Sequence, residues 1–262
     1  MDINAIKKKL NQLQTSTSIK DNLWKPKPGT NQIRIVPYAH NKDNPFIELF
    51  FHYDIGNRTY MSPMSFGRPD PIEEFAEKLK SSGNRDDWKL GRKLDAKMRT
   101  FLPVIERGKE KEGVKFWGFG KTVYQELLGF IADPDYGDIA DPMTGRDVVV
   151  DFKSAEETGR SYPTTTIRVK PNQTPLTENK DMLESLLENQ TEITELYTEK
   201  SYDELAEILE NWLNPKESDD NASEDSSNSN TTSNSNTKDS SAKPEKVVEN
   251  VGDAFEDLFG EG

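Results

Sequence analysis

Between residues 78 and 121 the sequence mixes positive charge with aromatic rings. This stretch carries 13 Lys or Arg residues against 6 Asp or Glu residues. Cations attract phosphates and exposed rings stack on unpaired bases, so the combination is typical of a surface that holds a nucleic-acid strand. The residues expected to bind DNA are basic or aromatic, and four of them lie further along the chain: Lys89, Arg92, Lys93, Lys97, Arg99, Phe101, Lys115, Trp117, Phe119, Lys121, Tyr124, Tyr162, Arg168 and Lys170.

The sharpest local signal is the segment VKFWGFGKTVY at residues 114–124. Its Gly-Lys-Thr end is similar to a phosphate-binding P-loop, but that motif needs a glycine where Lys115 stands. The segment is better interpreted as a strand that presents aromatic rings, followed by a helix that begins with a lysine. Alternation along a strand must bury some of these rings. We expect Trp117 to be the ring that is exposed for stacking.

A very basic helix is predicted from Arg85 to Arg99. At helical spacing its lysines and arginines fall along one side of the helix. A solvated helical face explains such charges equally simply. Their position next to two further basic and aromatic segments favours the binding interpretation. The residues on that side are Lys89, Arg92, Lys93 and Lys97.

Composition argues against a metal centre, a cofactor and an enzyme. The chain has no cysteine and two histidines, His40 and His52, too few for a His-based zinc site. The aspartates of residues 133–141 lack the glycine and terminal glutamate of an EF-hand and stand beside Pro and Gly, so Asx-turns explain them. No Ser/His/Asp pattern for nucleophilic catalysis is evident. We therefore expect a binding protein without a cofactor.

The elements that must position these residues are short strands and inserted helices. Strands are predicted at 32–37, 45–60 (as a hairpin turning at Gly56–Asn57), 101–106, 114–119, 147–152 and 164–170. Helices are predicted from 70 to 80, 85 to 99 and 121 to 131, and again after residue 177, where Ser201 and Glu204 form a capping box. The fold class expected is α+β with a mainly β core, a Greek-key barrel of the OB type with inserted helices and a C-terminal helical appendage.

The net charge changes sign along the chain. Residues 176–262 hold 6 basic and 23 acidic residues, whereas the whole chain has a net charge of −13. From residue 216 the sequence has almost no apolar residues, which is typical of a disordered tail. We therefore expect a basic arm at 1–20 that contacts neighbours, a binding core at 21–214 and an acidic partner-binding tail at 215–262. Apolar residues return at the tail tip as a docking motif for partners, namely Phe255, Leu258 and Phe259.

No stretch reaches about 18 consecutive apolar residues, so no membrane span is expected. The first residues, MDINAIKKKLNQLQ, lack the apolar core of a signal peptide. We expect an intracellular protein.

With these residues in place, the chain resembles the single-stranded DNA-binding, helix-destabilising protein of T-even-like tailed phages. The similarity is best at residues 97–105, 115–124 and 200–212. The order of parts also matches: a basic arm, an OB-type core and an acidic tail with a Leu/Phe-containing end. Within these blocks Phe101, Trp117 and Tyr124 match aromatic positions of the family.

The resemblance implies a protein that coats single-stranded DNA cooperatively during phage replication, recombination and repair in the cytoplasm of the infected host. It places Lys7, Lys8 and Lys9 in the arm that contacts the neighbouring copy, although Leu10 follows the lysines where the family has Ser or Thr. It also implies that the acidic tail recruits replication and recombination proteins.

One departure from the family concerns metal. The family holds a structural zinc with one histidine and three cysteines between the hairpin and the basic helix, and residues 60–87 contain neither residue type. We infer that packing replaces the zinc. The side chains expected to do so are Met61, Met64, Phe66, Ile72 and Phe75.

Two other functions fit parts of the sequence. An OB-type RNA-binding regulator would share every feature described above, and 2′-hydroxyl contacts would distinguish it. An acidic interaction adaptor that does not bind nucleic acid would use the basic region to contact another protein.

Overall fold

The computed structural model describes residues 21–214 together with Phe255 and Leu258. The described residues form two compact units. Unit 1 comprises residues 21–51, 61–67 and 97–199. Unit 2 comprises residues 52–60, 68–96 and 200–214, with the two residues of the C-terminus.

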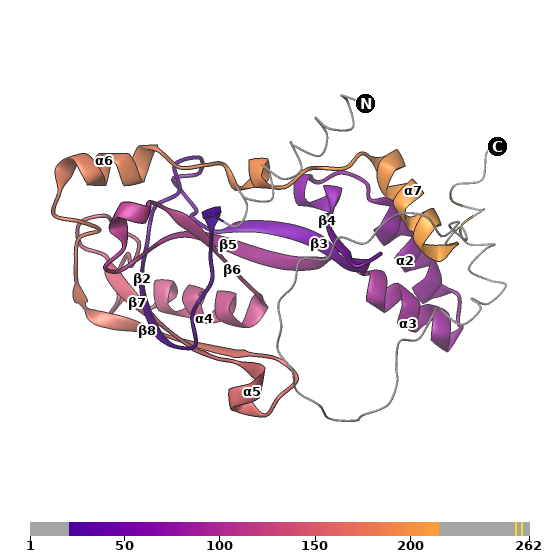
Figure 1. Cartoon of the computed structure of the whole chain (residues 1–262), viewed down its shortest axis with the longest axis horizontal. Coiled ribbons are helices and arrows are strands. Elements are labelled where there is room, and N and C mark those ends of the chain that lie inside the picture. Colours follow the sequence, from indigo (N-terminus) through magenta and orange to yellow (C-terminus); the bar gives the residue numbers. More distant parts are fainter. Residues whose placement is uncertain (1–20, 215–254, 256–257, 259–262) are drawn as a thin grey trace, which may run out of the picture. The chain divides into compact units, whose positions relative to one another are not determined.

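The elements alternate between strands and short helices (Figure 1). The strands are β1 (Leu23–Trp24), β2 (Gly29–Ile35), β3 (Ile47–Ile55), β4 (Arg58–Met61), β5 (Lys97–Glu106), β6 (Lys115–Phe119), β7 (Arg146–Lys153) and β8 (Thr164–Gln173). The α-helices are α2 (Pro71–Ser81), α3 (Arg85–Leu94), α4 (Lys121–Ala132), α5 (Ala155–Thr158), α6 (Lys180–Glu188) and α7 (Tyr202–Leu213). Three 3-10 turns are η1 (Pro63–Phe66), η2 (Glu110–Glu112) and η3 (Ile193–Leu196).

The β core is a mixed sheet in the order β1-β6-β5-β2-β7-β8, with β3 also paired to β5 and β4 paired to β3. Strand β5 connects the two parts of the sheet, because its first half pairs with β3 and its second half with β2. The α+β class with a mainly β core is confirmed. The expected closure into an OB-type barrel is not observed, since within the described residues β1 and β8 end the sheet without pairing with each other.

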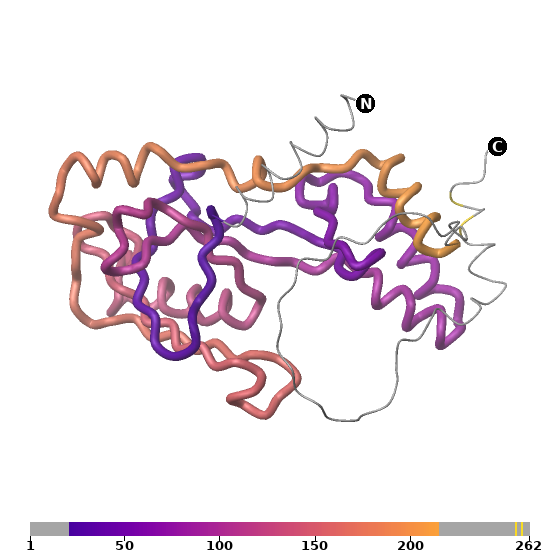
Figure 2. Tube along the Cα trace, in the orientation of Figure 1, coloured from indigo at the N-terminus to yellow at the C-terminus, as the bar shows by residue number. Residues whose placement is uncertain are grey.

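In unit 1 both faces of the sheet are covered. Leu102 and Val104 of β5 belong to an apolar cluster that includes Val123 and Leu127 of α4. Their neighbour Ile105 points to the other face and packs with Leu186 of α6 and other residues. Figure 1 shows these two helices on opposite sides of the strands, and Figure 2 shows the orange trace from α6 to η3 running along one side. Because side chains alternate along β5, this strand contributes to the apolar core on both faces of the sheet.

Unit 2 is mainly helical. Helices α2, α3 and α7 and the end of β3 share one apolar cluster, with Phe75 and Leu209 fully buried in it. Helix α2 begins as predicted, because the Asp70 side chain caps the backbone N–H groups of Ile72 and Glu73. The capping box of Ser201 starts α7, also as predicted.

The hairpin between β3 and β4 turns at the predicted dipeptide. Gly56 and Asn57 have φ angles of 59° and 58°. Two successive positive φ angles match a type I′ turn, whose twist suits a two-residue hairpin.

Helix α3 is shorter than predicted, and two basic residues that were expected in the helix lie in strand β5 instead. The helix ends at Leu94, with Asp95 as its C-cap, and the chain continues as β5 from Lys97. Asp95 accepts a hydrogen bond from Lys80 at 2.6 Å, and Glu73 accepts one from the Ala96 N–H at 2.8 Å. These contacts from α2 fix the chain in an extended conformation. Lys97 and Arg99 are therefore strand residues, and the predicted helical row that included Lys97 is wrong.

Candidate nucleic-acid interface

Three basic side chains of unit 1 stand where β5 and α4 begin. Lys97, Arg99 and Lys121 are exposed. The Arg99 guanidinium donates a hydrogen bond to the carbonyl of Gly118 at 2.6 Å, so it lies across the neighbouring strand β6. No acidic side chain among the described residues pairs with Lys97 or Lys121. These charges are available to phosphates.

Gly118 is a residue of this surface that the sequence analysis missed. A Cβ atom there would lie 2.9 Å from Arg99 Nε and 2.9 Å from the Phe101 ring. Glycine thus allows Arg99 to lie flat on the strand above a buried ring. Its position among aromatic residues in a strand was the available signal, because glycine inside a strand often marks a close approach.

The expectation that Trp117 is exposed for stacking is wrong. Only 2% of its surface is accessible, and Phe101 and Phe119 are equally buried. Trp117 packs edge-on against Trp24, with ring centroids 5.6 Å apart, and against Phe119 at 4.7 Å. The reason is that β6 lies between β5 and β1, which leaves its inner face under α4. These rings build the core that supports the basic side chains.

Two other predicted aromatic residues of unit 1 do reach the surface. Tyr162, before β8, is 59% exposed. Tyr124 of α4 is half-buried and packs against Phe46, with ring centroids 5.0 Å apart. Burial, together with the nearby Glu48 carboxylate, raises the pKa of Tyr124 to about 12. The Tyr124 phenol therefore stays neutral throughout the physiological range.

In unit 2 the basic residues of α3 are exposed but locally paired. Lys89 bridges to Asp86 at 2.7 Å and Arg92 to Asp95 at 2.9 Å. The Lys93 ammonium lies 5.7 Å from the centre of the Trp212 ring. Exposed pairs of this kind contribute only about 0–1 kcal/mol, so a phosphate can replace the carboxylate.

Trp88 is an exposed ring that the predicted site residues did not include. Half of its surface, 50%, is accessible, and the Arg92 guanidinium lies 5.8 Å from its ring centre. Trp88, Arg85, Lys89 and Arg92 recur at helical spacing on the side of α3 opposite the buried Gly91 and Leu94. That periodicity was the signal that could have identified it.

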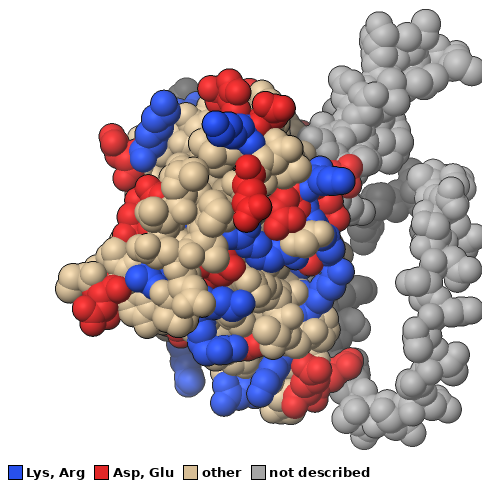
Figure 3. Space-filling view, turned by 90° about the vertical axis from the view of Figure 1, so that its left-hand side faces the viewer, with Lys and Arg blue, Asp and Glu red and all other residues tan. Residues whose placement is uncertain are grey.

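Strand β8 has the predicted core face and basic face. Ile167 and Val169 are buried, whereas Arg168 is exposed and Lys170 half-exposed. Arg168 bridges to Asp151 at 3.3 Å, and Lys170 donates to Gln32 at 2.8 Å. Figure 3, which views the end where α6, β2, β7 and β8 lie in Figure 1, shows Lys and Arg side chains grouped in the middle and lower part of that face.

Lys115, at the start of β6, is half-buried and bridges to Glu112 at 2.5 Å. It therefore offers a phosphate less free charge than Lys97 or Lys121.

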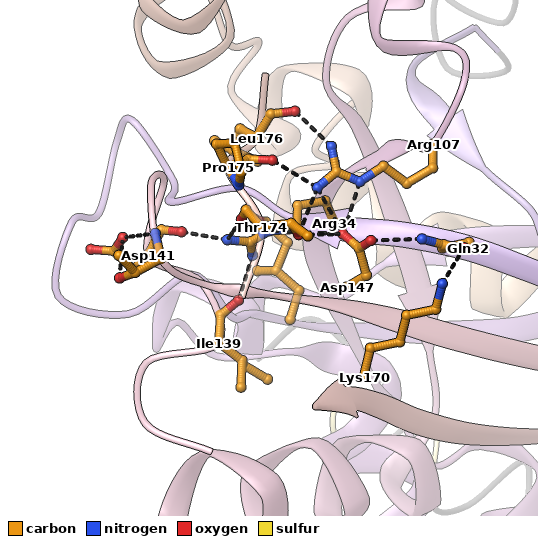
Figure 4. Close-up of polar contacts among 12 residues, drawn as sticks. Gln32, Arg34, Arg107, Ile139, Asp141, Asp147, Lys170, Thr174, Pro175 and Leu176 are labelled. Atoms are coloured by element: carbon orange, nitrogen blue, oxygen red, sulfur yellow. Dashed lines mark hydrogen bonds and ion pairs between the residues drawn. The ribbon is translucent and has the colours of Figure 1, made fainter. Parts of the chain in front are cut away.

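A buried polar network crosses the middle of the sheet (Figure 4). Arg34 of β2 is fully buried and donates to the carbonyls of Ile139 and Asp141. Burial and the nearby Arg107 lower the pKa of Arg34 to about 10. Asp147 bridges to Arg107 at 2.7 Å and lies 4.0 Å from Arg34 Nε, which has no hydrogen-bond partner. The network joins strands to loops, and burial keeps the charges of Arg34 and Asp147 away from a DNA strand.

His52 of β3 precedes residues 60–87, where the resemblance implied a zinc ion, and contacts that region through Asp70. Its surroundings do not fit a zinc ion. Nδ1 lies 2.7 Å from the Leu94 carbonyl and Nε2 lies 2.9 Å from the Asp70 carboxylate, so both ring nitrogens are engaged. The chain has no cysteine, and the described residues hold no group of three potential ligands. The histidine, which the sequence analysis assigned to no function, is a fully buried structural residue.

The predicted replacement of zinc by apolar packing is partly wrong. Met61 of unit 1 and Ile72 and Phe75 of unit 2 are buried, but Met64 and Phe66 are 38% and 39% exposed. The buried His52 also contacts this region, through its hydrogen bond with Asp70.

The aspartates between α4 and β7 form the expected Asx-turns. Asp133 accepts from the Asp135 N–H at 3.0 Å and Asp138 from the Ala140 N–H at 2.8 Å. Asp141 accepts from the N–H groups of residues 143 and 144. These carboxylates are engaged with their own backbone.

Two predicted functional segments lie wholly or partly outside the residues that the structure describes. The arm residues Lys7, Lys8 and Lys9 and the tail residue Phe259 lie outside the described residues. Phe255 and Leu258 are described and pack against the apolar cluster of unit 2. Among the described residues, every helix is too short or too polar to cross a bilayer.

Comparison with known proteins gives one family. A family model described as "gp32 DNA binding protein like" matches residues 27–215, more than half of the chain. No curated protein matches the chain.

Proposed function

Because the chain belongs to the gp32-like family of DNA-binding proteins, we propose that it binds single-stranded DNA with little sequence preference. The observation that supports this best is that the family match includes both basic surfaces, the start of β5 and α4 in unit 1 and α3 in unit 2. Exposed cations bind phosphates, and exposed rings stack on bases that only a single strand offers. Paired bases in a duplex are unavailable to these rings.

The proposed role is that of a coat on single-stranded DNA during phage replication, recombination and repair, in the cytoplasm of the infected host. Lys7, Lys8 and Lys9 would contact the neighbouring copy along the strand and make binding cooperative. Residues 21–214 would form the binding core, and the acidic tail, residues 215–262, would recruit replication and recombination proteins through Phe255, Leu258 and Phe259.

Titration with poly-dT tests the function. Tryptophan fluorescence is expected to fall as the strand binds, and log affinity is expected to fall with log salt concentration by about 0.7 for each phosphate contacted. The absence of a complex even at low salt would contradict the proposal and favour an interaction adaptor. A matched RNA oligomer is the control, since tighter binding of RNA would indicate an RNA-binding protein instead.

Trp88→Ala is expected to weaken poly-dT binding by about 1–3 kcal/mol, the usual contribution of one stacked base. The reason is that Trp88 is the most exposed tryptophan of the basic stretch. Trp117→Phe is the matched control and is expected to leave affinity unchanged, because the Trp117 side chain is buried. Fluorescence anisotropy of a labelled strand measures the affinity of both variants. A loss of affinity in the Trp117 variant alone would contradict the assignment of Trp88 as the stacking residue.

A further inference from the structure

The C-terminal tip of the chain contacts unit 2. Phe255 and Leu258 are both helical, lie three residues apart and are half-buried against the apolar cluster of α2, α3 and α7. The Phe255 ring lies 6.0 Å from the ring of Phe75, at an interplanar angle of 74°. Residues 215–254 separate this tip from the end of α7. Two large apolar side chains of an otherwise mostly polar tail thus contact the helices that precede it.

The contacted surface is suited to such a tip. Phe75 is fully buried and belongs to the core, whereas Ile208 and Trp212 of α7 are half-buried at the edge of the same cluster. An apolar edge of this kind gains from being covered by further apolar side chains. Lys93 places a positive charge beside Trp212, and the tip sequence DAFEDLF carries three acidic residues. The apolar edge and the positive charge therefore suit a short acidic segment with apolar anchors.

We propose that the apolar surface of α2 and α7 is a receptor for a short acidic Phe-x-x-Leu helix, and that the chain's own tip occupies it in the free protein. Phe255 and Leu258 are the anchors. Covalent attachment through residues 215–254 gives the tip an effective concentration on the order of millimolar, so a weak contact is enough to hold it. A partner protein that recognises the same two side chains must take them from this receptor.

The absence of cysteine from the chain allows a direct test in the full-length protein without DNA. Leu258→Cys introduces a single thiol, whose rate of reaction with Ellman's reagent reports its accessibility. The thiol is expected to react about ten-fold more slowly than the same cysteine in a synthetic peptide of residues 251–262, because the contact with unit 2 covers part of the side chain and must open for full access. Adding Phe255→Ala to Leu258→Cys is expected to restore the rate of the free peptide.

A rate in the full chain equal to that in the peptide would overturn the proposal. So would protection that deepens with protein concentration, since that result would make a second copy the occupant. Thermal unfolding gives a second measurement: Phe255→Ala with Leu258→Ala is expected to lower the melting temperature by a few degrees if the tip is docked, and an unchanged melting temperature would contradict docking. Neither assay contains DNA, so failure here and failure of the poly-dT titration are independent.

Discussion

Replacing Asp147 by alanine is expected to lower the free energy of unfolding by about 3–5 kcal/mol, the usual loss when one partner of a buried ion pair is removed. Asp147 is 5% exposed and provides the carboxylate for two guanidinium groups. Without it the fully buried Arg34 faces Arg107 with only the weaker influence of the Asp141 and Asp138 carboxylates to compensate. Asp147 also accepts a hydrogen bond from Gln32 at 2.6 Å, which the variant would lose.

Urea denaturation followed by circular dichroism measures this loss. Asp151→Ala is the matched control, because Asp151 lies on the same strand and pairs with Arg168, which is exposed. Its expected loss is about 1 kcal/mol, from an exposed ion pair and one hydrogen bond to Thr30. Asp147→Asn removes the charge but keeps the side-chain volume. It therefore separates the effect of losing the charge from the effect of leaving a cavity. Equal losses for the variants at positions 147 and 151 would show that the buried network does not depend on this charge.

Local signals in the sequence predicted the elements that depend on few neighbours. Helix α2 follows from Asp70 and Pro71, which cap and open it, and the hairpin follows from a Gly-Asn dipeptide that accepts positive φ angles. Sheet closure is different, because it depends on which strands lie at the two edges. Strands β1 and β8 are far apart in sequence, and no local pattern specifies whether they pair.

The end of α3 shows how tertiary contacts override a local pattern. Residues 85–99 read as one basic helix, yet Lys80 and Glu73 of α2 hold the chain at Asp95 and Ala96 and end the helix there. The contacts come from residues about 15 to 23 positions earlier in the chain. A pattern read along one segment does not contain them.

The wrong expectation that Trp117 is exposed and the omission of Trp88 from the predicted site have a related cause. Both lie in the basic stretch, and composition alone does not distinguish them. Trp117 is buried because a two-residue strand, β1, pairs in parallel with β6 and places Trp24 against it. Trp88 is exposed because its side of α3 faces away from Leu94. Helical periodicity is sufficient to predict that Trp88 is exposed, whereas the burial of Trp117 is evident only from the fold.

Asp70→Asn is the second substitution with a large expected effect, and its size comes from the protonation of His52. One ring nitrogen faces the Leu94 carbonyl and the other faces the Asp70 carboxylate, and both partners accept hydrogen bonds. A neutral histidine has one N–H group, so satisfying both acceptors requires the charged imidazolium. Burial opposes this charge, but the hydrogen bond and charge of Asp70, together with the Leu94 carbonyl, outweigh it and raise the pKa of His52.

The asparagine variant isolates the ion pair, because asparagine still caps α2 as well as aspartate does. Removal of the carboxylate leaves a fully buried histidine without its anion, and the expected loss at pH 6 is about 3–5 kcal/mol. Circular dichroism during urea denaturation of the full chain gives this value, with the fluorescence of Trp88 and Trp212 as a second probe of unit 2.

The same pair sets a direction for the pH dependence of stability. A histidine whose pKa is higher in the folded state binds more protons there than in the unfolded chain, so stability falls as pH rises. The contribution of His52 to stability is fully present below its unfolded pKa of about 6.5 and is lost as pH rises through its raised folded pKa.

Asp70→Asn is expected to remove most of this decrease in stability with pH. The other histidine of the chain, His40, is exposed, and His40→Gln is the control that should preserve the slope. Stability that rises between pH 6 and 8 in the wild-type chain would show that His52 is neutral, and the β3 end would then be held to α2 and α3 by apolar packing alone.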